Sequence, residues 1–574
     1  MKKWIAPRDQ HVECKKPVPY LDQKTAVFDA VVVGSGAGGA TAAYVLVNYG
    51  LKVLLLDAGR MLHPPKDFLT HTMPWELPFR GQGKPGEYDG LWKINEYTAH
   101  LYTNPRKETY DSIDNFHWTR LRAVGGRTNT WGRCCFRHGP LDFKSKTRQG
   151  YADDWPIDYE DIEPYYDKVE RLVGIVGNKD NYYNMPDGVY CGPPHRLRCG
   201  EVLLMERAKK VGVPVLHERT AVLSVPYDGR PACHYCGECG NGCDVRARFS
   251  SLDVLIPKLL KQPNFTLRTN SAVYQVLTND EGLARGVSFY DSLSQQYNEV
   301  SARTVVLAAS TVESGRILLN SKSRQHPNGL GNSSGLIGHY LMDTTKSGPV
   351  MGVMPLMRNR QRVDEDGAGG GHVTIPRFNY RRKNSYYGGY FLLGGTGFGR
   401  GISSSGGAST WGAALKKQIR QDYGATLSFR GYGERLADFN NYFEIDPSNK
   451  DRFGIPQVRF HVSTSDNDIK MMDDAYGWIE EVMRACDAEI LPYKKRVEPM
   501  GDATHEAGAC RMGTDAKTSV LNPFCQLHDV KNLFVTDASC FVTSPGTHGI
   551  TTWIMALSWR ASDHLAEQMK KGEL

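Results

Sequence analysis

A glycine-rich turn between a buried strand and a helix constrains the fold of this chain more than any other feature of the sequence. Residues 28–33, FDAVVV, form a short β-branched apolar run of the kind that fills a parallel sheet. The glycine-rich turn at 34–39 follows and opens an alanine-rich segment that stops at Gly50, and residues 52–59 give a second strand pattern. This order predicts a β-turn-α-β unit, the building block of a nucleotide-binding α/β domain.

The spacing of the glycines predicts a dinucleotide site at the start of that helix. Gly34, Gly36 and Gly39 give the pattern G-x-G-x-x-G. The first glycine permits the tight turn, the second lets the backbone approach a pyrophosphate, and the third lets helix and strand pack closely. Asp57, at the end of the second strand, is placed to accept hydrogen bonds from ribose hydroxyls. The pattern alone does not distinguish FAD from NAD.

The order of the remaining elements predicts more than one domain. A chain of 574 residues exceeds the roughly 250–300 residues that one hydrophobic core can serve. Residues 303–310 and 532–539 repeat the buried-strand pattern, and they are followed by helix patterns at 311–320 and 551–569. Because nucleotide-fold elements lie at both ends of the chain, the cofactor domain must be discontinuous. Between about 340 and 500, apolar and polar residues alternate as they do in antiparallel strands.

We therefore expect a Rossmann-like α/β cofactor domain and a second, α+β domain built on an antiparallel sheet. The cofactor domain is assigned residues 25–60, 115–140, 205–335 and 500–574, with a cysteine-rich loop inserted at 233–243. The second domain, which would bind substrate and cap the site, is assigned residues 61–114, 141–204 and 336–499.

Charge and hydropathy exclude some classes of partner. The net charge of +7 is mild for this length, and no dense Lys/Arg run suggests a nucleic-acid surface. No apolar run approaches the roughly 18–20 residues of a membrane span. The first 29 residues lack the apolar core of a secretory signal, so the chain is not expected to export itself. The compartment stays open, since a co-exported partner could carry the chain out of the cytoplasm.

Two histidines near the C-terminus are candidates for catalysis. His505 and His548 lie in Gly/Pro/Thr-rich loops on either side of the buried strand that ends at Asp537. The ends of strands in an α/β sheet commonly present functional side chains, although a lone histidine is more often structural. Imidazole titrates near neutral pH and is suited to removing a hydroxyl proton.

The chain resembles the glucose–methanol–choline (GMC) oxidoreductases, flavoproteins that oxidise alcohols and sugars. The resemblance rests on four segments in the family's order: the N-terminal glycine motif with Asp57, VGGRTNTWG at 124–132, HEAGACRMG at 505–513, and NLFVTDAS…THGITTWIMALSWRA from 532. It implies a GMC-type FAD-binding domain with a substrate domain. It also implies oxidation of a secondary hydroxyl of a sugar or glycoside, with C3 and a 3-keto product as one candidate, and hydride transfer to flavin N5.

The resemblance also implies roles for individual residues. His505 matches the general base, and His548 the second member of a His–His or His–Asn pair that holds the substrate oxygen. Asp537 matches the acid near the ribityl and pyrophosphate groups, and Val273 a valine beside the adenine. The cofactor-binding residues are expected to be Gly34, Ser35, Gly36, Gly39, Asp57, Gly125, Gly126, Asn129, Thr130, Trp131, Val273, Ala309, Asp537 and His548. Some relatives carry a flavin-bonding histidine where this chain has Thr130, so we expect a non-covalent FAD.

Four cysteines within eleven positions add a metal-binding pattern. Cys233, Cys236, Cys239 and Cys243 have the C-x2-C-x2-C-x3-C spacing of bacterial ferredoxins, with Asp244 in place of the usual proline. The spacing favours an iron–sulfur cluster, 3Fe–4S or 4Fe–4S, over thiolate-bound zinc or four unligated thiols, which remain alternatives.

The cysteine run resembles the bacterial branch of the family that includes gluconate 2-dehydrogenase, FAD-dependent glucose dehydrogenase and glycoside 3-dehydrogenase catalytic subunits. In that branch a cluster relays electrons from the flavin, which implies a small gamma-type subunit and a cytochrome or other electron acceptor as partners. Three readings compete with this one: a flavin oxidase that uses O₂ and has structural zinc, a gluconate or glucose dehydrogenase catalytic subunit, and a non-catalytic electron-transfer subunit.

Overall fold

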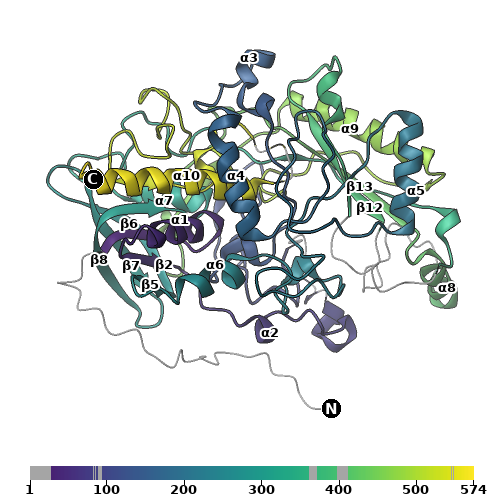
Figure 1. Ribbon diagram of the computed structural model, residues 1–574, viewed down its shortest axis with the longest axis horizontal. Helices are drawn as coiled ribbons and strands as arrows, with labels where there is room; N and C mark the ends of the chain where they lie inside the picture. The colour runs from purple at the N-terminus through teal and green to yellow at the C-terminus, as the bar shows by residue number, and fades with distance from the viewer. Residues whose placement is uncertain are drawn as a thin grey trace.

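Two seven-stranded sheets and one three-stranded sheet form the described part of the molecule, which comprises residues 28–81, 83–84, 86–87, 93–360, 372–396, 411–544, 546 and 549–574. Figure 1 shows this computed structural model with the two large sheets on opposite sides. The expected combination of a Rossmann-like sheet and an antiparallel sheet is confirmed. No helix of these described ranges has both the length and the apolar character that crossing a lipid bilayer requires.

Ten α-helices are found in these ranges. They span Ala37–Asn48 (α1), Pro64–Asp67 (α2), Ser145–Gln149 (α3), Tyr159–Val173 (α4), Cys199–Ala208 (α5), Ser251–Leu259 (α6), Thr311–Asn320 (α7), Gly412–Asp422 (α8), Asp466–Ala485 (α9) and Ile550–Lys571 (α10). The helix expected at 311–320 has these bounds, and the helix expected at 551–569 is longer by one residue at its start and two at its end.

The first large sheet is mixed and is built around five parallel strands. Its parallel strands lie in the order β5–β2–β1–β8–β17 and span Phe265–Arg268, Val53–Leu56, Phe28–Val33, Gln296–Leu307 and Leu533–Val535. An antiparallel ribbon of β6 (Ser271–Thr278) and β7 (Ala284–Asp291) pairs with the first half of β8. Since β8 pairs with both β1 and β17, one sheet joins the two ends of the described chain.

Helices pack closely on this sheet because α1 is rich in small residues. α1 lies against α10 and α6, and α10 also contacts α4, as Figure 1 shows at its left and centre. A Cβ added at Gly38 would lie 2.3 Å from the carbonyl oxygen of Thr536, so the helix could not sit this close with a larger residue. The hydroxyl of Ser558 on α10 donates to the carbonyl oxygen of Gly38 at 2.7 Å.

The second large sheet is antiparallel. Its strands lie in the order β16–β10–β13–β12–β11–β4, with β9 beside β13, and span Glu489–Ile490, Val350–Val353, Thr426–Gly433, Tyr390–Thr396, Val373–Ile375, Leu216–His217 and Thr345–Lys346. α9 packs on this sheet through Met471, Met472 and Ala475, which are almost completely buried. The antiparallel strands expected between about 340 and 500 are thereby confirmed.

A small third sheet connects to the part of the molecule built on the parallel strands. It contains β3 (Asp111–Ile113), β14 (Tyr442–Lys450) and β15 (Pro456–His461), and β3 runs parallel to β15. α7 packs on β14 so closely that a Cβ at Gly315 would lie 2.6 Å from the ring of Phe443.

The predicted domain boundaries stay a prediction. The strands of the parallel sheet come from segments assigned to the cofactor domain, whereas α4, from a segment assigned to the second domain, packs on α10.

Candidate active site

A cavity of about 630 Å³ opens beyond the carboxyl ends of the central parallel strands. Val33, Leu56 and Ala308, which end or directly follow β1, β2 and β8, line it. Phe391 and Tyr432, from β12 and β13 of the antiparallel sheet, line it as well. Open α/β sheets bind ligands at this edge, and the volume lies within the roughly 300–1,000 Å³ of ligand sites.

The glycine-rich turn forms part of the cavity wall with the geometry that its motif predicts. Gly34 has φ +94°, and a Cβ there would lie 2.5 Å from the carbonyl oxygen of Ala308. A Cβ at Gly39 would lie 1.8 Å from the carbonyl oxygen of Gly34, so Gly39 is required for helix–strand packing behind the wall. Gly36 has open space where a Cβ would stand, and it caps α1 without a side-chain hydrogen bond. The N–H groups of the first turn of α1 can therefore meet a pyrophosphate.

Asp57 lines the cavity and also holds the glycine-rich turn. Its carboxylate accepts hydrogen bonds from the N–H and hydroxyl of Ser35 and, at 2.7 Å, from the N–H of Gly59. The Ser35 hydroxyl oxygen in turn accepts from the N–H of Gly125 at 2.8 Å. Burial raises the pKa of Asp57, while these hydrogen bonds favour the ionised form. The predicted ribose-binding residue thus also fixes the spacing between the turn and the 124–132 loop.

The 124–132 loop lies directly against the glycine-rich turn. Gly126 has φ +51°, and a Cβ there would lie 3.4 Å from the Cα of Gly36. Thr130 lines the cavity, and its hydroxyl lies 2.6 Å from the hydroxyl of Tyr102. Trp131 also lines the cavity and donates its indole N–H to the carbonyl oxygen of Phe249.

Two other residues predicted from this loop lie behind the wall. Asn129 is fully buried and donates to the carbonyl oxygen of Val124 at 2.9 Å, so it braces the loop. Gly125, with φ +92°, packs against the Asn129 side chain and Leu252.

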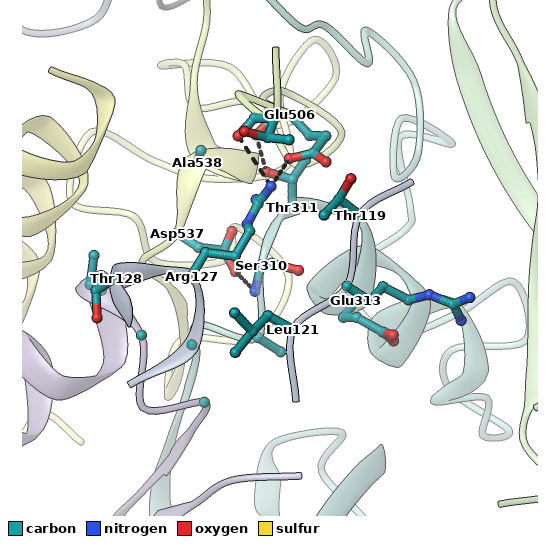
Figure 2. Close-up of a pocket in the computed structure, with 18 of the residues that line it drawn as sticks. Thr119, Leu121, Arg127, Thr128, Ser310, Thr311, Glu313, Glu506, Asp537 and Ala538 are labelled. Atoms are coloured by element: carbon teal, nitrogen blue, oxygen red, sulfur yellow. Dashed lines mark hydrogen bonds and ion pairs between the residues drawn. The ribbon is translucent and has the colours of Figure 1, made fainter. Parts of the chain in front are cut away.

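The end of β17 meets the start of α7 at Asp537. One carboxylate oxygen accepts from the N–H of Ser310 and the hydroxyl of Ser314, and the other from Ser539. Figure 2 shows Asp537 beside Ser310 at the cavity wall. Burial raises the pKa of Asp537. Val273 and Ala309, which were also predicted, line the same cavity.

His505 lines the cavity and is held by two neighbours that the sequence did not single out. Its ring Nδ1 lies 3.0 Å from the hydroxyl oxygen of Thr344. Its backbone N–H donates to Asp343 at 2.9 Å, and the second oxygen of Asp343 accepts from the N–H groups of Gly501 and Ala503. Burial, and then the charge of Glu506, raises the pKa of Asp343 to about 6. A fully buried carboxylate therefore organises the turn that presents His505.

An ion pair joins the turn with His505 to the 124–132 loop. Arg127 donates to Glu506 at 2.6 Å and to the carbonyl oxygen of Thr504 at 3.1 Å. Figure 2 shows Arg127 directed at Glu506 over the start of α7. The side chain of Glu506 is 2% exposed, so a cation is needed beside it.

His548 lies outside the described residues. Its described neighbours Gly549, Ile550 and Thr551 line the same cavity as His505. The paired-histidine arrangement therefore stays a prediction.

The cysteine-rich segment reaches the cavity through Gly240, which lies between Cys239 and Cys243 and is part of the wall. Cys239 and Cys243 are buried, and Cys233 and Cys236 are half-buried. Burial, and then the thiols of Cys239, Cys236 and Cys243, raises the pKa of Cys233 to about 12. The four thiols are therefore close enough to interact electrostatically.

The spacing of these thiols bears on which metal they could hold. Within the described residues, no three of the four sulfur atoms lie within 4.8 Å of one another. One tetrahedral zinc ion with bonds of about 2.3 Å would need its thiolates about 3.8 Å apart. As placed in this structure, the sulfur atoms therefore do not form the ligand set of a single zinc ion, and the iron–sulfur cluster stays a prediction.

Comparison with known proteins gives one family. The two family models described as GMC oxidoreductase match residues 28–345 and 440–558. The chain is 30% identical to 2-methyl-1,2-propanediol dehydrogenase of Mycolicibacterium austroafricanum, over 94% of this chain and 95% of that protein. It is 26% identical to the fructose dehydrogenase large subunit of Gluconobacter japonicus, over 96% of this chain and 100% of that protein. A solved formate oxidase from Aspergillus oryzae RIB40 shares the fold, with a TM-score of 0.62 at 17% identity over 95% of this chain and 99% of that one.

Proposed function

The chain belongs to the GMC oxidoreductase family, which oxidises alcohol and sugar hydroxyls with FAD, and we propose that it is a dehydrogenase acting on a secondary hydroxyl of a sugar or glycoside. The observation that carries the proposal is that one cavity is lined both by the glycine-rich turn with Asp57 and by His505. A cofactor bound at the glycine-rich turn and a base presented by residues 501–506 would therefore lie in the same cavity.

The residues present fit FAD. Gly36 leaves room for a pyrophosphate at the open N-terminus of α1, and Asp57 lines the cavity where a ribose would follow. Bound FAD would supply the acceptor for the hydride that leaves the substrate carbon. Thr130 stands where some relatives have a flavin-bonding histidine, and a threonine hydroxyl engaged by Tyr102 supports a non-covalent cofactor.

His505 would remove the hydroxyl proton. In the tautomer in which Nδ1–H donates to the Thr344 hydroxyl oxygen, the other ring nitrogen carries the lone pair that a general base needs. Asp343 would fix the position of the imidazole through the backbone of His505. His548 would hold the substrate oxygen as its negative charge develops.

The antiparallel sheet would provide the substrate-facing wall. Phe391 and Tyr432 line the cavity as a stacked pair, with ring centroids 5.3 Å apart and an interplanar angle of 5°. Aromatic faces pack well on the C–H faces of a sugar ring. Lys93 and Arg133 also line the cavity and offer hydrogen-bond donors to sugar oxygens. This wall favours a sugar or glycoside, with C3 of the ring as one candidate position for oxidation.

Electrons would leave through the cysteine-rich segment. Gly240 brings that segment to the cavity wall, so a cluster on its cysteines would lie next to the flavin site. A cluster there would convert a two-electron step into single-electron steps for a cytochrome or other acceptor. The relative from Gluconobacter japonicus is named a large subunit, which supports a small partner subunit for this chain as well.

The proposal is tested by anaerobic mixing with a panel of sugars, glycosides, gluconate and simple alcohols while the flavin absorbance is followed. We expect bleaching with a sugar or glycoside, turnover with an artificial acceptor, and a keto product whose position is assigned by NMR. Bleaching by gluconate or glucose alone would favour the alternative of a gluconate or glucose dehydrogenase catalytic subunit. Hydrogen peroxide formed at the rate of sugar oxidation would instead identify an oxidase, and no bleaching with any substrate would overturn the proposal.

A further inference from the structure

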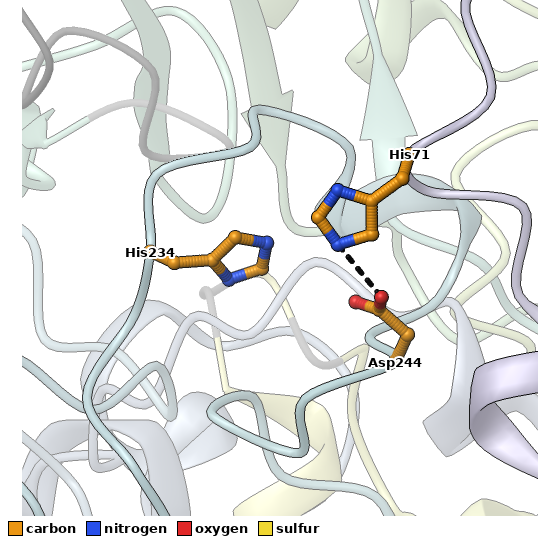
Figure 3. A group of neighbouring side chains, drawn as sticks. All are labelled: His71, His234 and Asp244. Carbon is orange, nitrogen blue, oxygen red and sulfur yellow. Dashed lines mark ion pairs between the residues drawn. The ribbon is translucent and has the colours of Figure 1, made fainter.

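We propose that His71, His234 and Asp244 bind one divalent transition-metal ion, with Zn²⁺ as the ion to test, at a site separate from the four cysteines. Figure 3 shows the three side chains converging from two segments of the chain. His71 comes from the turn that follows α2. His234 and Asp244 come from the cysteine-rich segment, one within it and one directly after it.

The three side chains are close enough to share one ion. One potential ligand atom from each lies within 4.8 Å of the other two. Nε2 of His71 lies 2.7 Å from a carboxylate oxygen of Asp244, and the rings of His71 and His234 have centroids 5.0 Å apart. His71 and His234 are exposed, so movements of about 1 Å by their side chains would bring the three atoms to the roughly 2.0–2.2 Å of zinc–nitrogen and zinc–oxygen bonds.

The carboxylate of Asp244 has acceptor capacity left for an ion. Its Oδ1 atom is buried and has no hydrogen-bond partner among the described residues. A buried carboxylate oxygen without a partner costs free energy, and buried polar atoms are normally satisfied by protein, water or an ion. A divalent cation between the carboxylate and the two imidazoles would satisfy it.

An apolar contact next to the three side chains holds the segment with His71 beside the segment with Asp244. Phe68 is buried, and its ring lies against Gly242, where an added Cβ would stand 2.3 Å from the ring. Residues 68–71 therefore run beside residues 242–244, with an apolar contact at one place and the His71–Asp244 contact at the next. A site whose ligands are already brought together by packing binds a metal without ordering the chain first.

The donor set indicates the class of metal. Two imidazole nitrogens and one carboxylate oxygen suit Zn²⁺, which is bound by His and Asp, and this set contains no thiolate. His71 is 57% exposed and His234 is exposed, so a fourth position remains open to water. The ion would cross-link the segment after α2 to the cysteine-rich segment. Gly240 of that cysteine-rich segment forms part of the cavity wall.

The experiment loads the full-length holoprotein with Zn²⁺, removes free metal by gel filtration and measures zinc per chain by mass spectrometry. X-ray absorption at the zinc edge then identifies the ligands, because it is specific to zinc and is not obscured by flavin or iron. We expect one zinc per chain with nitrogen and oxygen ligands. His71→Ala and Asp244→Asn should each weaken zinc binding by at least about tenfold, since even indirect partners of a metal contribute that much.

His63→Ala provides the matched control, because His63 is exposed on the same segment eight residues before His71. It should retain zinc at the level of the unchanged protein. His71 is exposed, and Asp244→Asn conserves the shape of the side chain, so both variants should fold. Circular dichroism checks that they do. The proposal is overturned if no zinc remains after gel filtration, if the ligands are sulfur, or if His71→Ala and Asp244→Asn bind zinc as well as His63→Ala does.

Discussion

Asp343 accepts a hydrogen bond of 2.9 Å from the backbone N–H of His505, which lies 162 residues later in the sequence. The same carboxylate accepts three further backbone N–H groups, from Thr344, Gly501 and Ala503. It is fully buried, so these bonds are not shared with water. The position of the candidate base is therefore set by a carboxylate that itself belongs to neither the cavity wall nor the sequence motifs.

Asp343→Asn should slow flavin reduction by substrate by about 10–100-fold while FAD stays bound. The amide that replaces one carboxylate oxygen cannot accept an N–H, and a displacement of about 1 Å at a catalytic group can cost two orders of magnitude. Stopped-flow absorbance under anaerobic conditions measures the rate. Asp529→Asn, which removes an exposed carboxylate bonded to Ser333, is the control and should leave the rate unchanged. Equal rates in both variants would show that Asp343 does not position His505.

Asp343 should also make stability depend on pH. Its pKa is about 6 in the folded protein and 3.8 is the ordinary value, so between about pH 4 and 6 the folded state binds more protons than the unfolded state. The contribution of Asp343 to the free energy of unfolding therefore falls as pH rises through that window. Between pH 5 and 7 the unchanged protein should lose about 1 kcal/mol of unfolding free energy relative to Asp343→Asn. Urea unfolding at both pH values measures the difference, and a difference independent of pH would contradict the assignment.

Arg127→Met should destabilise the protein by about 3 kcal/mol, because it leaves the carboxylate of Glu506 buried without a cation. The double variant with Glu506→Gln should recover much of this loss, since it removes the unpaired charge. Thermal unfolding of the holoprotein measures both. Arg285→Met breaks an exposed pair with Glu299 and should cost less than about 1 kcal/mol. A cost for Arg127→Met as small as that of Arg285→Met would mean that the buried pair contributes little.

Gly36→Ala and Gly39→Ala should fail in different ways. A Cβ at Gly36 meets no protein atom within 4 Å, so the variant should fold but bind FAD at least about tenfold more weakly, because the methyl group occupies the space of the pyrophosphate. A Cβ at Gly39 would lie 1.8 Å from the backbone, so that variant should lose stability as well. Gly477→Ala on α9, also in open space, is the control. FAD titration and unfolding of the cofactor-free protein separate the two effects.

The sequence predicts local elements well and long-range contacts poorly. The strand at 28–33 and the helix at 311–320 follow from hydrophobic periodicity and flanking turn residues, which act within a few positions. The role of Asp343 depends on a turn more than 150 residues away. Nothing in its local sequence, LMDT at 341–344, marks Asp343 as a hydrogen-bond acceptor for that turn. The meeting of His71 with Asp244 likewise depends on how two loops pack, which no local pattern encodes.

Predicted site residues also separate into two groups once the fold is known. Thr130 and Val273 line the cavity, as a family motif leads one to expect of cofactor contacts. Asn129 belongs to the same motif but faces inward and bonds to Val124. A motif records that a residue type recurs, whereas only packing shows whether its side chain meets the ligand or braces the wall.

Cys243→Ser should separate substrate oxidation from electron exit. If the four cysteines hold an iron–sulfur cluster beside the flavin site, loss of one buried thiol should remove iron and slow reduction of a cytochrome or one-electron dye by at least about tenfold. Reduction of the flavin by substrate should continue, because His505 and the glycine-rich turn are untouched. Cys199→Ser, at an exposed cysteine on α5, should leave both steps and the iron content unchanged. Iron and sulfide analysis with stopped-flow kinetics tests this, and an equal effect of the two substitutions would count against a cluster at these cysteines.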